Sequence, residues 1–122
     1  MTIQRKLEDS YKITEFDRGG NHVSVSITVN DDGSLHIDDH SYGLLADAMY
    51  GDGRDVEHWL DIGADAVRKL STEMTGAATP GAANDLAKLL AKTFKGENLA
   101  LKSIKDLCDK ENIDYKEELW PW

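Results

Sequence analysis

Residues 23–37 read VSVSITVNDDGSLHI, and this stretch decides the fold. In residues 23–29, valine or isoleucine alternates with serine or threonine, a pattern typical of a strand that buries one face. Residues 30–34 are turn formers, and Gly33 suits the positive φ that hairpin turns require. Leu35 and Ile37 resume the alternation after the turn. The stretch therefore predicts a β-hairpin.

Three further segments predict strands. Residues 11–16 alternate weakly, with Phe16 out of phase, and fit a short edge strand. Residues 56–62 fit both strand and helix spacing, and their regular alternation favours a strand. Residues 115–120 predict a last short strand before Pro121.

Helical segments lie mostly in the second half of the chain. Residues 44–50 fit a short helix, and Asp65 is placed to cap a helix that runs to about Met74. Apolar residues at helical spacing predict two more helices, one that includes residues 86–94 and one over residues 97–110. Their apolar stripes are Leu86, Leu89, Leu90 and Phe94 in the first, and Leu101, Ile104, Leu107 and Cys108 in the second.

Strand segments and helix segments are largely segregated along the chain, which is typical of an α+β fold. The length of 122 residues suits one domain, residues 1–122. We therefore predict a single α+β domain with an antiparallel β-sheet packed against three to four helices. The sheet would contain the N-terminal hairpin strands plus one or two later strands.

The chain is acidic, with 23 Asp and Glu residues against 14 Lys and Arg residues and a formal net charge of −9. A negative surface repels phosphate, so this balance argues against nucleic acid as a direct partner. Cys108 is the single cysteine and cannot form an internal disulfide; a buried apolar thiol is expected there. Residues 1–11 lack the apolar core of a secretory signal, and no segment has the length and apolarity of a membrane span. These features predict a cytoplasmic protein without a membrane partner.

Most of the negative charge lies in the first half of the chain. Residues 1–62 hold 13 acidic and five basic side chains, whereas residues 63–122 hold ten and nine. A solvated acidic surface would explain this asymmetry, and so would a docking face for a basic protein. In the docking hypothesis, acids of the strand-rich half bind the partner and aromatic side chains anchor it. The predicted partner-binding residues are Asp31, Asp32, Asp38, Asp39, Tyr42, Asp52, Asp55, Glu57 and Trp59.

No catalytic motif stands out, and we predict neither enzyme activity nor a cofactor. The alternative is a small metal-dependent enzyme, because His36, Asp38 and His40 would share one strand face and could bind zinc or iron. Residues two apart on a strand are spread by about 6–7 Å, which is awkward for one small ion, so an exposed polar face is favoured. The C-terminal residues 120–122, Trp-Pro-Trp, fit either a segment folded back onto the sheet or an exposed anchor.

Several short stretches are similar to a group of small bacterial proteins of unassigned function: residues 19–25 (GGNHVSV), 31–37 (DDGSLHI), 42–43 (YG) and 50–52 (YGD). In size and acidity the chain also resembles immunity proteins of bacterial toxin–immunity pairs, including those of contact-dependent growth inhibition systems. This resemblance implies a stoichiometric inhibitor that binds and neutralises a basic toxin, such as a nuclease. Phage-encoded inhibitors of host defence complexes, such as anti-CRISPR proteins, share these features equally and stay open as an alternative.

Overall fold

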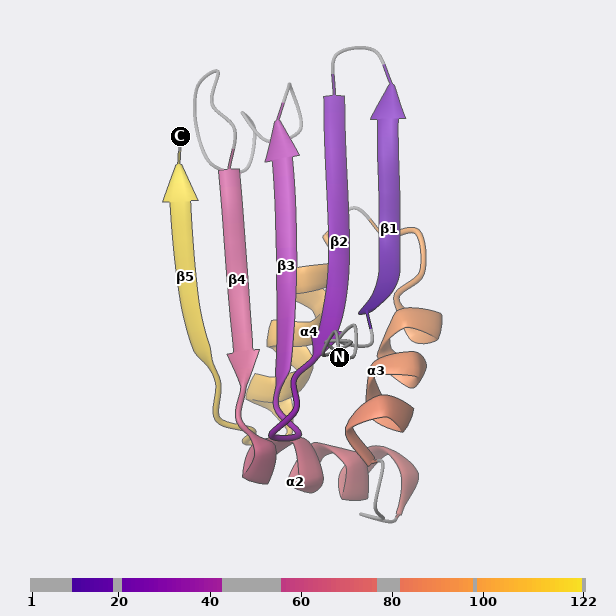
Figure 1. Cartoon of the computed structure of the whole chain (residues 1–122), viewed down its shortest axis with the longest axis vertical. Coiled ribbons are helices and arrows are strands. Elements are labelled where there is room, and N and C mark those ends of the chain that lie inside the picture. Colours follow the sequence, from indigo (N-terminus) through magenta and orange to yellow (C-terminus); the bar gives the residue numbers. More distant parts are fainter. Residues whose placement is uncertain (1–9, 19–20, 43–55, 77–81, 98, 122) are drawn as a thin grey trace, which may run out of the picture.

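A five-stranded antiparallel sheet, in the order β1-β2-β3-β4-β5, organises the protein. The computed structural model describes residues 10–18, 21–42, 56–76, 82–97 and 99–121 (Figure 1). The strands are β1 (Ser10–Arg18), β2 (Asn21–Val29), β3 (Leu35–Tyr42), β4 (Val56–Ile62) and β5 (Lys116–Pro121). The helices are α2 (Ala64–Thr75), α3 (Ala82–Thr93) and α4 (Ala100–Lys110). The predicted α+β class with an antiparallel sheet is confirmed.

The predicted hairpin forms β2 and β3. Ile27 pairs with Ile37, and the turn is closed by a hydrogen bond from the Asn30 amide to the Ser34 carbonyl at 2.9 Å. Gly33 has a φ of +86°, the left-handed conformation that glycine adopts without a steric penalty. The alternating sequence therefore sets the register of the two central strands.

A β-bulge explains the irregular pattern of β1. The register with β2 shifts between Lys12 and Thr14, so Ile13 is an extra residue. Tyr11 pairs with Ile27 and Phe16 with Val23, and both aromatic side chains pack against the core. Phe16 breaks the alternation of the sequence, and the extra residue in the bulge is what places it on the same side of the sheet as Tyr11.

α3 and α4 lie on one side of the sheet, and α2 runs across the lower end of the strands (Figure 1). α3 contacts β1 and β2, α4 contacts β3 and β4, and α2 packs against α3. The core between the layers is largely apolar; its fully buried side chains include Val25, Ile27, Ile37, Leu60, Leu90 and Ile104. Cys108 is buried on α4, as predicted, and burial raises the pKa of its thiol to about 11.

Two helix boundaries differ from the prediction. α2 begins at Ala64 with Gly63 in the N-cap position, so Asp65 lies in the first turn and does not cap the helix. There its carboxylate still faces the positive end of the helix dipole. α4 begins at Ala100, three residues later than the predicted start. The predicted helix over residues 44–50 lies outside the described residues.

None of the helices in the described ranges combines the length and the apolar character that crossing a bilayer requires.

Candidate functional site

The sheet has a second face, turned away from α2, α3 and α4, which we call the outer face. Side chains alternate along each strand, and the pairing register fixes which of them share this face. No described helix lies on it (Figure 1). Its described side chains are Ser10, Lys12, Glu15 and Asp17 of β1, His22, Ser24, Ser26 and Thr28 of β2, His36, Asp38, His40 and Tyr42 of β3, Glu57, Trp59 and Asp61 of β4, and Lys116 and Glu118 of β5.

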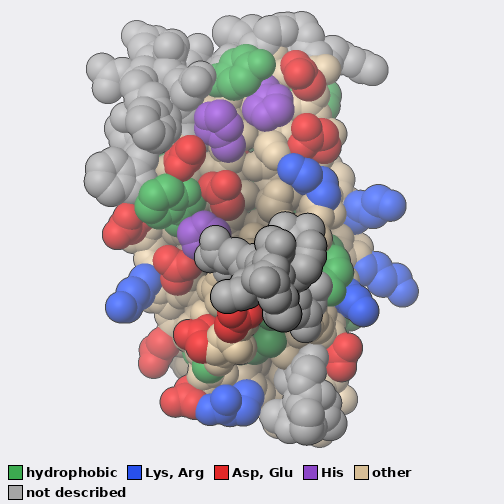
Figure 2. Space-filling model, viewed as in Figure 1, with side chains coloured by type: hydrophobic (Ala, Val, Ile, Leu, Met, Phe, Trp, Pro, Cys, Tyr) green, Lys and Arg blue, Asp and Glu red, His purple; other side chains and the backbone are tan. Residues whose placement is uncertain are grey.

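Negative charge exceeds positive charge on the outer face. Six of its described side chains are acidic and two, Lys12 and Lys116, are lysines. Lys12 is already paired with Glu15 at 3.1 Å. Figure 2 shows acidic, histidine and hydrophobic side chains together over this face. The outer face is therefore an acidic surface with aromatic side chains in it. The six acidic residues are Glu15, Asp17, Asp38, Glu57, Asp61 and Glu118.

The structure brings four of the predicted partner-binding residues to the outer face. They are Asp38 and Tyr42 of β3 and Glu57 and Trp59 of β4. Burial raises the pKa of the Asp38 carboxyl, and the neighbouring Glu57 carboxylate raises it further. Asp38 and Glu57 are thus close enough to repel one another.

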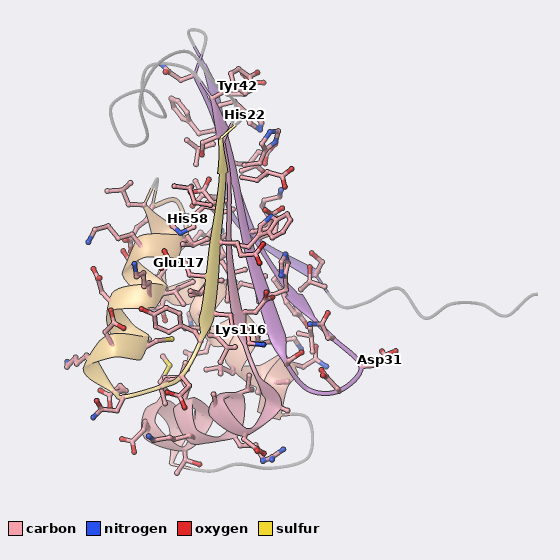
Figure 3. All side chains as sticks on the ribbon, turned by 90° about the vertical axis from the view of Figure 1, so that its left-hand side faces the viewer. His22, Asp31, Tyr42, His58, Lys116 and Glu117 are labelled. Atoms are coloured by element: carbon pink, nitrogen blue, oxygen red, sulfur yellow. The ribbon has the colours of Figure 1, made fainter. Side chains whose placement is uncertain are left out.

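Asp31 and Asp32 lie in the exposed β2–β3 turn, at the end of the hairpin far from His22 and Tyr42 (Figure 3). Asp32 accepts hydrogen bonds from the Ser34 amide at 2.9 Å and from the Ser34 hydroxyl at 2.6 Å. These bonds lower the pKa of Asp32 and make it part of the turn. Asp52 and Asp55 lie outside the described residues.

A groove of about 650 Å³ connects the turn to the outer face. Asp32 and Ser34 line one part of it, and Asp61 and Lys116 of the outer face line another. The remaining wall is formed by residues 62–66 and 114–115, with Asp65 and Asp114 as further acids. The acidic surface therefore continues from the sheet to Asp32.

Asp39 does not belong to this surface. It alternates with Asp38 along β3, so it points toward the helices, and its exposed fraction is 2%. Its placement among the partner-binding residues was wrong, because two consecutive aspartates of a strand cannot share a face. Burial raises the pKa of Asp39, while a hydrogen bond from the Ser41 hydroxyl at 2.5 Å acts in the opposite direction.

Asp39 is part of a small polar cluster on the helix-facing side of the sheet. His58 lies directly opposite Asp39 on β4, and its Nε2 is 2.6 Å from Glu117 Oε2 (Figure 3). Lys105 of α4 reaches the same Glu117 carboxylate at 2.9 Å. Burial opposes ionisation of Glu117, but its contacts to Lys105 and His58 outweigh burial and leave its pKa lowered. The cluster joins α4 to β4 and β5.

Asp39→Asn is expected to change how stability depends on pH. A raised pKa means that the folded protein holds the Asp39 proton more tightly than the unfolded chain does. The contribution of Asp39 to the free energy of unfolding is therefore full below the ordinary pKa of 3.8 and is lost as pH rises through the pKa of the folded state. The variant keeps an oxygen for Ser41 but cannot titrate. We expect the free energy of unfolding of the wild type, minus that of the variant, to fall as pH rises above 3.8, measured by urea denaturation. If the difference between the two unfolding free energies does not change with pH, the claim that the ionised Asp39 carboxylate destabilises the fold is contradicted.

Two histidines of the outer face contact each other, since the His22 and His40 rings meet edge-on with their centroids 6.0 Å apart. His36 Nδ1 is 2.6 Å from Asp61 Oδ1, and the His22 ring stacks on Tyr42 with ring centroids 5.0 Å apart. His36, Asp38 and His40 do share the face, as the alternation of β3 predicts. Within the described residues, however, no group of three or more His, Cys, Asp or Glu side chains could hold a metal ion.

Sequence reasoning missed four acids of the outer face: Glu15, Asp17, Asp61 and Glu118. Asp61 follows Glu57 and Trp59 at the same two-residue spacing, which is the signal that could have found it. The position of Glu118 on a strand could be predicted, because the sequence predicts a strand over residues 115–120. Its place on the outer face could not, because the sequence does not predict which strand residues 115–120 pair with.

Comparison of the chain with known protein families, with characterised proteins and with solved structures finds no match.

Proposed function

We propose that this protein is a stoichiometric inhibitor that binds a basic protein through the outer face and neutralises it. The observation that carries the proposal is the gathering of six carboxylates, against two lysines, on a sheet face that no described helix covers. A cluster of one charge sign on one face raises the encounter rate with an oppositely charged partner and disfavours like-charged ones.

The aromatic side chains support binding to a protein. Trp59 and Tyr42 lie among the carboxylates of the outer face, each with part of its surface exposed. Tryptophan and tyrosine are enriched among the residues that contribute most to protein–protein affinity. Carboxylates would thus steer the partner and the aromatic rings would supply contact area.

The proposed class of partner follows from charge. A protein that cleaves or binds nucleic acid must present a basic surface to phosphate. Carboxylates on a sheet face can take the place of those phosphates and block the partner's nucleic-acid-binding cleft. We therefore propose an immunity protein that neutralises a basic toxin such as a nuclease. The alternative is a phage-encoded inhibitor that uses the same surface to bind a host defence complex. The identity of the partner decides between an immunity protein and such an inhibitor.

Affinity capture of the tagged protein from its native cell lysate at low ionic strength tests this proposal. We expect one basic protein in near-stoichiometric amount, eluted by a salt gradient, whose activity is lost at equimolar inhibitor. A captured partner that is acidic, or one that salt does not elute, would contradict the electrostatic mechanism. A partner that keeps its activity in the complex would contradict inhibition.

A further inference from the structure

Trp59 lies at the centre of four carboxylates on the outer face. Asp38 of β3 and Glu118 of β5 are its direct cross-strand neighbours, and Glu57 and Asp61 lie two residues away on β4. Directly opposed side chains of antiparallel strands have Cβ atoms about 4.5–5.5 Å apart. Residues two apart on one strand are about 6–7 Å apart. All four carboxylates can therefore reach a group that lies against the indole ring.

The indole ring is held by its neighbours. Trp59 donates a side-chain hydrogen bond to the Asp38 carboxylate. The His36 ring lies on another side, with ring centroids 5.9 Å apart and planes inclined by 55°. His36 is itself held by Asp61 at 2.6 Å. A ring fixed in this way loses little conformational entropy when a ligand binds.

The surroundings of Trp59 carry a net negative charge. Lys116 is the lysine closest to it in the register, opposite Asp61 and diagonal to Trp59.

We propose that Trp59 and the four carboxylates around it bind an arginine side chain of the partner; this inference rests on the proposed function of the outer face. A guanidinium is planar, stacks on tryptophan and donates forked hydrogen bonds that match carboxylates. A lysine ammonium is compact and strongly hydrated, and it satisfies the carboxylates without covering the ring. The four carboxylates are Asp38, Glu57, Asp61 and Glu118.

Titration of the ¹⁵N-labelled protein with hexa-arginine and with hexalysine tests the inference, because the two peptides carry the same charge. We expect hexa-arginine to bind about two- to five-fold more tightly, as a cation–π contact predicts. The largest shift should be at the indole N–H of Trp59. Equal affinity for the two peptides would overturn the inference.

Variants of Trp59 separate the contribution of the aromatic ring from that of the carboxylates around it. Trp59→Leu should bind both peptides with similar affinity, whereas Trp59→Phe should keep part of the preference for arginine. Leu119→Ala is the control, since Leu119 is exposed on the helix-facing side of β5 and outside the outer face, and it should keep the full preference. A preference that survives in Trp59→Leu would also overturn the inference, provided that its spectrum is that of a folded protein.

The outcomes also separate this inference from the proposed function. If both peptides shift outer-face residues equally, the acidic face binds cations and only the arginine preference fails. If neither peptide shifts any outer-face residue, the electrostatic basis of the proposed function fails as well.

Discussion

Replacing Glu57, Asp61 and Glu118 together by lysine is expected to slow association with the basic partner by roughly 10- to 1000-fold at low salt. These three acids surround Trp59 on the outer face. Their reversal removes the attraction that steers the partner and adds repulsion in its place, so the effect falls mainly on the association rate. Stopped-flow mixing or surface plasmon resonance would measure it.

The control variant carries the same change of net charge on the helices. Glu73 of α2, Asp85 of α3 and Asp106 of α4 are exposed, and their reversal to lysine leaves the outer face intact. We expect an association rate close to that of the wild type. At about 1 M ionic strength, where the Debye length is about 3 Å, the two variants should converge. Equal slowing by both variants would show that net charge acts rather than the outer face.

Leu60→Ala is expected to lower the free energy of unfolding by about 2–5 kcal/mol. Leu60 is fully buried on the helix-facing side of β4, beside Ile37 of the central strand. The substitution removes apolar surface from the core and leaves a cavity that close-packed neighbours fill only in part. Urea denaturation would measure it, with an unchanged m-value as the sign of an intact unfolding transition.

Leu119→Ala is the matched control for this prediction. Leu119 is on the same side of the sheet, on the neighbouring strand β5, but its exposed fraction is 47%. We expect a change within about 0.5 kcal/mol, as for other surface positions. A similar loss in both variants would mean that the core is not where the structure places it.

Much of the fold could be predicted because local patterns determined it. The alternation of residues 23–29 and the turn at Gly33 specify a hairpin without reference to the rest of the chain. The bulge at Ile13 could not be predicted, since it depends on the register in which β1 pairs with β2. It also depends on the hydrogen bond that the Gly96 amide donates to the Ile13 carbonyl. Such contacts join segments far apart in the sequence.

The candidate site was predicted only in part, for a related reason. Alternation alone places Asp38 and Trp59 on polar positions of their strands, but it does not say that β3 and β4 pair with Asp38 opposite Trp59. Counting charge along the chain also treated Asp38 and Asp39 alike, whereas the pleat sends them to opposite faces. Glu118 joined the site through the pairing of β4 with β5, after three intervening helices.

The most direct test of the outer face is a parallel affinity capture with three baits from one lysate. The baits are the wild type, the outer-face variant with lysine at residues 57, 61 and 118, and the helix-side control with lysine at residues 73, 85 and 106. We predict that one basic protein is retained in near-equal amount by the wild type and the control and is lost from the outer-face variant. Retention of that protein by the folded outer-face variant, or its loss from the control alone, would contradict binding through the outer face.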